Sequence, residues 1–147
     1  MEILQIISGF FTPIISIISF YISFQQYITN KKKLRLDLYE KRFAVYEAVV
    51  SFLSHVMAQG TAKMAEINKF TEIINKSYFL FDSKMTDYLY KIQNKGLDLN
   101  TNKENREPDL TKEERTKLAK EWKVLVKWFN EQMDVSKEKF EKYLRYS

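Results

Sequence analysis

The chain has 147 residues, of which 24 are basic and 19 acidic, so its formal net charge is +5. It contains no cysteine, which excludes disulfides and thiolate metal sites. One histidine and three glycines leave little material for a histidine-based metal cluster or a glycine-rich phosphate loop, so we expect no metal and no cofactor.

The first predicted element is a long helix without charge. No charged residue lies between Glu2 and Lys31, and 13 of the 22 residues from Ile3 to Phe24 are Ile, Leu or Phe. As a helix these residues would extend over ~33 Å, against ~30 Å for the hydrocarbon core of a bilayer. We therefore predict that residues 1–30 are a transmembrane anchor. A cleaved signal peptide and a soluble core helix are the alternatives.

Basic residues follow this run directly. Basic residues favour the cytoplasmic end of a span, and four of them follow this run: Lys31, Lys32, Lys33 and Arg35. This predicts an external N-terminus and a cytoplasmic domain over residues 31–147. The same four residues could form a collar that attracts anionic membrane lipid, or could be the topology signal alone. The rest of the chain is nearly balanced in charge, so no nucleic-acid partner is expected.

Polar side chains within the run gather on one side. At ~100° per residue, most of them fall within an arc of about 80°, with the glycine at its edge. Hydrocarbon cannot satisfy hydroxyl and amide groups, so this face is predicted to meet another helix. Self-association is favoured over a different membrane partner and over hydroxyls that bond back to their own helix. The predicted association face consists of Gln5, Ser8, Gly9, Thr12, Ser16, Ser19, Ser23 and Gln26.

Pro13 lies inside the same predicted helix. It cannot donate a backbone hydrogen bond to the carbonyl of Gly9, which can kink a helix. Gly9 and Pro13 are therefore a candidate hinge, and the alternative is an ordinary membrane-helix proline.

The remaining chain has the spacing of helices. From residue 36 to 57, apolar residues recur at alternating steps of three and four, which is typical of a helix in a bundle. Gly60 then marks either the end of that helix or a bend. No glycine or proline separates this helix from the predicted span, so the two are expected to be continuous. The apolar positions are Leu36, Tyr39, Phe43, Tyr46, Val50, Leu53 and Met57.

Three further helices are predicted. The second covers residues 61–75, and the third starts near Asp82-Ser83 and reaches Gly96. Residues 98–110 are polar and predict a loop. Thr111 and Glu114 have the spacing of a capping box at the start of a last helix that continues to Leu144. The predicted fold is all-α: one transmembrane helix followed by an antiparallel bundle of about four helices.

No arrangement of side chains predicts catalysis, so an enzyme is not expected. His55 is expected to be a bundle-edge or hydrogen-bonded histidine and not a catalytic one. The charges at Asp37, Glu40, Lys41 and Arg42 have the spacing of surface ion pairs. The aromatic residues Tyr88, Tyr90 and Trp128 are candidates for a partner-binding surface.

The segment KLRLDLYEKRFAVYE, residues 33–47, resembles a helix in small bacterial single-span membrane proteins of uncharacterised function. Phe79-Leu-Phe-Asp82 and Phe140-Glu-Lys-Tyr-Leu144 look similar to later landmarks of that group. The resemblance implies a bacterial inner-membrane location and an all-helical domain, and it implies no catalytic residues.

Two functions are expected to compete. The first is a homo-oligomeric inner-membrane protein that self-associates through its polar face and permeabilises the membrane under control of the bundle. A role in defence or in a stress response is suggested for such a protein by analogy alone. The alternative is a membrane-tethered adaptor or inhibitor that binds a cytosolic protein.

Overall fold

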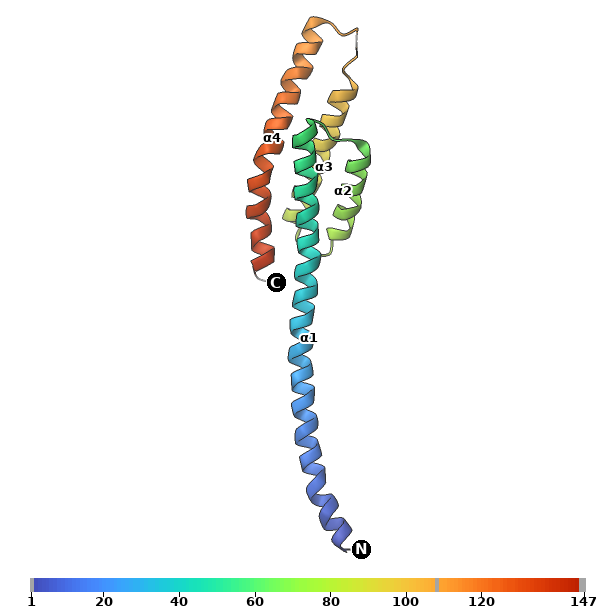
Figure 1. Ribbon diagram of the computed structural model, residues 1–147, viewed down its shortest axis with the longest axis vertical. Coiled ribbons are helices and arrows are strands. Elements are labelled where there is room, and N and C mark those ends of the chain that lie inside the picture. The colour runs from blue at the N-terminus through green and yellow to red at the C-terminus, as the bar shows by residue number, and fades with distance from the viewer. Residues whose placement is uncertain (1, 108, 146–147) are drawn as a thin grey trace. The chain divides into compact units, whose positions relative to one another are not determined.

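The computed structural model describes the backbone of residues 2–107 and 109–145, and the side chains of Phe11, residues 13–107 and residues 109–145. The described chain forms four helices (Figure 1). They are α1 (Glu2–Gln59), α2 (Met64–Ser77), α3 (Ser83–Glu104) and α4 (Lys112–Arg145). The prediction of an all-helical bundle is confirmed.

The chain divides into two compact units, Met1–Asp37 and Leu38–Ser147. Helix α1 contributes residues to both units and is one helix from Glu2 to Gln59, as the sequence predicts. The second unit holds the rest of α1 together with α2, α3 and α4. Successive helices of this unit run in opposite directions (Figure 1), and we call it the bundle.

The expectation of a transmembrane anchor is wrong, and with it a single-span inner-membrane location. Within the described part of the chain, no helix combines the length and the apolar character needed to cross a membrane. Ser, Thr and Pro make up five of the 14 residues from Phe11 to Phe24, and Gln25 and Gln26 follow, which lowers the mean hydropathy of this part of the helix.

The centre of the bundle is aromatic. Phe52 of α1 stacks on Phe70 of α2, with ring centroids 4.7 Å apart, and meets Phe129 of α4 edge-on at 6.3 Å. Gly96 of α3 provides the space for this ring, because a Cβ atom there would lie 3.0 Å from Phe52 Cζ. Each of the four helices therefore contributes to one packed centre. The fully buried apolar residues around it include Val49, Leu53, Ile67, Ile74, Leu89, Ile92, Leu99 and Phe140.

The helix ends have recognisable caps. Gly60 has φ +64°, and its N–H donates to the carbonyl of Val56 at 2.8 Å, so this glycine terminates α1. Asp82 caps α3 by accepting from the N–H of Met85 at 3.0 Å. At the start of α4, the N–H of Glu114 donates to Thr111 Oγ1 at 3.3 Å. The Glu114 carboxylate in turn accepts from the Thr111 N–H at 2.8 Å. The predicted capping box is confirmed.

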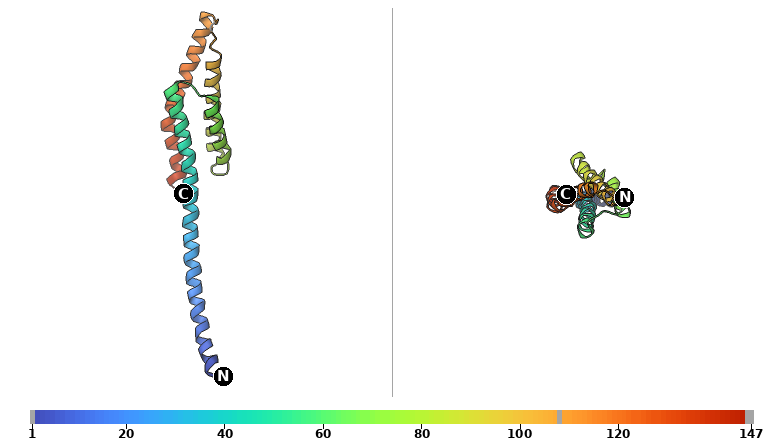
Figure 2. Two further views of the ribbon diagram at one scale, coloured as in Figure 1. Left: turned by 45° about the vertical axis from the view of Figure 1, so that its right-hand side comes forward. Right: turned by 90° about the horizontal axis from the view of Figure 1, so that it is seen from above.

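The predicted loop over residues 98–110 is too long. Helix α3 continues to Glu104, because its last turns bury Leu99 and hold Asn102 against α4. The Asn102 amide donates to the carbonyl of Leu118 at 3.0 Å. The upper ends of α3 and α4 reach beyond the ends of α1 and α2 that lie near them in the bundle (Figures 1 and 2).

Candidate functional site

Residues 11–28 of α1 carry a large exposed apolar surface. Ten large apolar side chains in this stretch are between 49% and 74% exposed. No charged residue interrupts them. A helix that is apolar around most of its circumference is normally buried. These residues are Phe11, Ile14, Ile15, Ile17, Ile18, Phe20, Tyr21, Ile22, Phe24 and Tyr27.

Part of this surface has the spacing of a coiled-coil stripe. Five positions alternate in steps of three and four, the pattern by which two helices pack along each other. We call these residues the seam: Ile14, Ile17, Tyr21, Phe24 and Ile28. Within the same segment Phe20 stacks on Phe24, with centroids 6.5 Å apart, and Gln25 donates to the Tyr21 hydroxyl at 3.2 Å.

The polar residues predicted as an association face lie on the other side of this helix, roughly 160° away from the seam. Ser16, Ser19, Ser23 and Gln26 are exposed. The surroundings of Gln5, Ser8, Gly9 and Thr12 are not among those that the structure describes, so the predicted face is described only in its second half.

Two other predicted features of the N-terminal unit stay predictions. Helix α1 continues through Pro13, and the hinge partner Gly9 belongs to the residues whose surroundings are not described. The collar residues Lys31, Lys32, Lys33 and Arg35 are all exposed, as binding of anionic groups would require.

Arg42 joins three parts of the bundle. Its Nε donates to the carbonyl of Leu80 in the α2–α3 turn, and its Nη1 donates to the carbonyl of Tyr143 in α4, both at 3.1 Å. The guanidinium also lies over the rings of Phe81 and Tyr143, at 5.9 and 5.8 Å from their centroids. Arg42 is half-buried and connects these segments, and the expectation that it also forms a surface ion pair stays a prediction. All three segments of the proposed resemblance meet at this residue.

Asp82 and Tyr143 form an acid–phenol pair beside Arg42. The Asp82 carboxylate accepts a hydrogen bond from the Tyr143 hydroxyl and, with a smaller effect, one from the Met85 N–H. These two hydrogen bonds hold the pKa of the Asp82 carboxyl below its ordinary value. Burial and the Asp82 carboxylate raise the pKa of Tyr143 to about 12. Lys142 lies 4.0 Å from Asp82. The pair ties the start of α3 to the end of α4.

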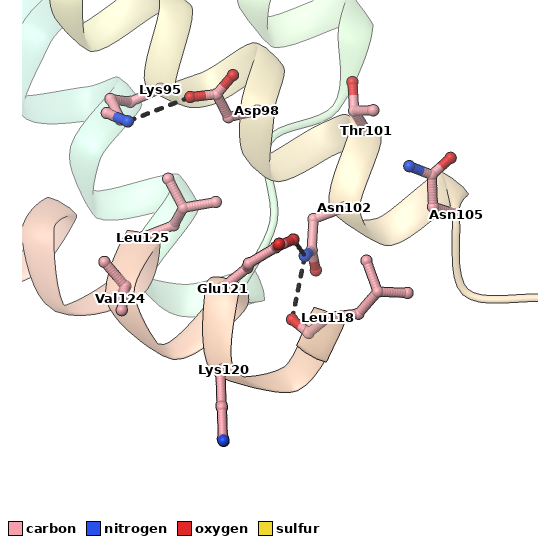
Figure 3. Close-up of a pocket in the computed structure, with 10 residues that line it drawn as sticks. All are labelled: Lys95, Asp98, Thr101, Asn102, Asn105, Leu118, Lys120, Glu121, Val124 and Leu125. Atoms are coloured by element: carbon pink, nitrogen blue, oxygen red, sulfur yellow. Dashed lines mark hydrogen bonds and ion pairs between the residues drawn. The ribbon is translucent and has the colours of Figure 1, made fainter. Parts of the chain in front are cut away.

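A groove of about 550 Å³ lies between α3 and α4 (Figure 3). Its apolar wall comes from Leu118, Val124 and Leu125 of α4, and Val124 is 69% exposed. Asn102 bridges the two helices across it, while Lys95 and Asp98 form an ion pair on the α3 side at 3.2 Å (Figure 3). The volume is within the range of ~300–1,000 Å³ common for binding pockets.

His55 lies at the edge of the bundle, as predicted. Its Nε2 contacts the carboxylate of Glu66 on α2, and its side chain is 38% exposed. The pair joins α1 to α2. Among the described residues no group of three or more His, Cys, Asp or Glu could hold a metal ion.

The three aromatic residues proposed as a partner surface have different surroundings. Tyr88 is buried, and its hydroxyl finds no hydrogen-bond partner within the described chain, while the Lys139 ammonium lies 4.9 Å from its ring centroid. Burial raises the pKa of Tyr88. Trp128 packs against the core, and Tyr90 is 39% exposed. They do not form one exposed patch. Helical spacing on α3 indicates this difference, since Tyr88 lies three residues after Met85 and four before Ile92, which are both buried.

Comparisons with protein-family models, with curated proteins and with solved structures find no match to this chain.

Proposed function

We propose that the protein is a homo-oligomeric binding protein rather than an enzyme, in which residues 11–28 join copies of the chain and the bundle carries the surface for other molecules. The observation that carries this proposal is the exposed, uncharged run of apolar side chains on α1. The permeabilising role considered from the sequence requires a span, so it is not retained.

The partner that fits the seam is a second copy. A 3-4-3-4 stripe is self-complementary, because each side chain enters the gaps of an identical helix. Burying one Ile or Phe side chain fully is worth about 1.5–3 kcal/mol, and each helix offers four such residues and Tyr21, against an association cost of roughly 4–15 kcal/mol. In water the hydroxyls of Ser19 and Ser23 are satisfied by solvent, so they belong on the outside of the assembly.

The test is the mass of the full-length chain in detergent-free buffer, measured by sedimentation equilibrium. Wild type is expected to be a discrete oligomer. Ile17→Glu with Phe24→Glu places two charges in the seam and should give monomers. Ser19→Glu with Ser23→Glu places the same charges on the opposite side and should leave the oligomer intact.

The two double variants also separate the competing faces. If the serine variant dissociates and the seam variant does not, then the hydroxyl face forms the contact and the seam proposal fails. A monomeric wild type would remove self-association altogether. Far-UV circular dichroism of each variant checks that the helices remain formed.

A second candidate function is an adaptor whose bundle binds another protein, and the groove between α3 and α4 favours it. An exposed valine with an ion pair and a buried amide around it gives the groove an apolar centre and a polar rim, which is the arrangement of protein interfaces. A photoreactive amino acid at position 124 should then crosslink to one defined protein. Purified, that protein should bind wild type and lose affinity for Val124→Glu, whereas Lys127→Glu on the exposed side of α4 should bind normally.

A further inference from the structure

The turn between α2 and α3 presents two aromatic rings to solvent. Phe79 is 90% exposed and Tyr78 is 60% exposed, and the two rings meet edge-on with centroids 5.2 Å apart. Both side chains lie in the five residues that connect Ser77 to Ser83. A phenylalanine at this exposure contributes nothing to the core, so the fold alone does not explain it.

The backbone beneath these rings is firmly held. The N–H of Leu80 donates to the carbonyl of Ser77 at 2.8 Å, and the Leu80 carbonyl accepts from Arg42. Phe81 packs edge-on against Phe140 at 5.5 Å and against Tyr143 at 5.2 Å. The exposed rings therefore stand on a fixed support, and a binding partner would not have to order the turn.

The surroundings of the turn are basic. The contacts of Arg42 and the approach of Lys142 to Asp82 place the start of the bundle's α1, the turn and the end of α4 at one end of the bundle. Residues 38–42, 76–84 and 141–145 carry six basic and three acidic side chains. Of the acidic ones, Asp82 already caps α3, and Glu141 pairs with Arg145 at 2.7 Å. Lys76, Lys84 and Lys142 are exposed.

We propose that this end of the bundle docks onto the surface of an anionic lipid bilayer. Phe79 and Tyr78 enter the boundary between headgroups and acyl chains, and the three lysines contact lipid phosphates. Aromatic rings beside lysines fit a lipid surface better than a protein surface, because the cores of protein interfaces are depleted of lysine. The bundle lies on the bilayer in this arrangement and does not enter it. The inference does not depend on self-association of α1.

The experiment uses the full chain and a local probe, because the apolar residues of α1 could adsorb to lipid by themselves. The chain has no cysteine, so Tyr78→Cys gives one site for an environment-sensitive fluorophore while Phe79 is kept. Asn94→Cys, at an exposed position of α3, is the matched control. Each labelled protein is titrated with vesicles of phosphatidylcholine and phosphatidylserine, and with vesicles of phosphatidylcholine alone.

With the mixed vesicles, emission from position 78 should shift to shorter wavelength, whereas position 94 should not change. Adding Phe79→Ser should weaken the apparent affinity about tenfold, and Lys76→Glu with Lys84→Glu should weaken it by a similar factor and remove the preference for phosphatidylserine. Circular dichroism of these variants checks the fold.

Three results would overturn the proposal. In the first, position 78 keeps its aqueous emission while the chain co-sediments with the mixed vesicles. In the second, both vesicle types give the same shift. In the third, the shift appears without vesicles as protein concentration rises, which would assign the turn to a protein contact.

Discussion

At the scale of single residues, Arg42 illustrates how one side chain can connect helices that are distant in sequence. Its two backbone acceptors, Leu80 and Tyr143, are 38 and 101 residues away. Hydrogen bonds from a charged donor are worth about 1.5–3 kcal/mol each when the acceptors are shielded from water. The planar fork of arginine reaches both carbonyls, which a lysine ammonium cannot do in the same way.

We therefore expect Arg42→Lys to lower the free energy of unfolding by about 2 kcal/mol, although the charge is kept. Urea denaturation followed by circular dichroism measures this change. Arg35→Lys is the matched control, because Arg35 is exposed, and it should change stability by less than about 0.5 kcal/mol. Equal effects of the two substitutions would contradict the role assigned to Arg42.

Asp82 predicts a pH dependence of stability. Its pKa in the folded chain is below the ordinary value of 3.8, so its contribution is present above that value and is lost as pH falls through the folded pKa. Wild type should therefore lose stability below about pH 4 more steeply than Asp82→Asn. Unfolding free energies measured from neutral pH down into this range test the expectation. Parallel curves for the two proteins would show that Asp82 is not the titrating group.

The residue scale also shows where the sequence is least informative. Periodicity places Arg42 on a helix but does not reveal that a turn 38 residues later brings a carbonyl to it. Charged neighbours at Glu40 and Lys41 made a solvated surface the natural expectation. His55 was easier to place, since Leu53 and Val56 beside it define the core side of the helix.

At the scale of helices, Gly96 gives the ring of Phe52 from α1 room against α3. A glycine inside a helix normally costs about 1 kcal/mol relative to alanine, so its presence needs a packing reason. The reason is the ring of Phe52, which cannot move aside because Phe70 and Phe129 contact it.

We expect Gly96→Val to lower the free energy of unfolding by about 2 kcal/mol, because the added methyl groups would overlap Phe52. Thermal and urea unfolding measure the effect. Asn94→Val, with the same new side chain at an exposed position of α3, should cost less than about 1 kcal/mol. If the two variants are equally stable, the close approach at Gly96 is not limiting.

The helices were predictable where local signals act alone. Steps of three and four residues identify the helices, although on α1 the positions Leu36, Tyr39 and Met57 of the predicted stripe are exposed and Leu53 is its buried member. The Thr111–Glu114 capping box and Gly60 mark helix ends through backbone hydrogen bonds. The end of α3 was not predictable in this way. Polar residues such as Asn102 suggest a loop, but here the amide is buried against α4, and the seven residues from 98 to 104 continue the helix.

At the scale of the whole molecule, the apolar run at the N-terminus was the strongest sequence signal and was misassigned. A long run of apolar residues predicts that the helix is buried, but it does not identify what covers the helix. A bilayer is one possibility, and other protein helices are another. Within the described residues, no helix is both long enough and apolar enough to cross a membrane. The groove between α3 and α4 had no sequence signal, because Leu118 and Leu125 have the spacing of ordinary core residues.

Assembly through the seam should become tighter as salt increases. Each chain carries a net charge of +5, with Lys31, Lys32, Lys33 and Arg35 just after the seam, whereas the seam itself contains no ion pair. Salt screens the repulsion between copies and leaves apolar contacts in place. Sedimentation at about 50 and 500 mM salt should show a lower dissociation constant at the higher concentration. A weaker assembly at high salt would indicate that ion pairs hold it.

Trp122 contacts the glycine that ends α1: its Nε1 donates to the Gly60 carbonyl at 2.7 Å, and the indole lies within 3.2 Å of where a Cβ would be placed. The chain has only two tryptophans. With Trp128→Phe as background, the native fluorescence of the remaining indole becomes an optical gauge of whether α4 is closed over α1. Its emission should shift to longer wavelength when Trp122 separates from Gly60, before or together with the loss of helix. The order of unfolding events can then be followed without a label.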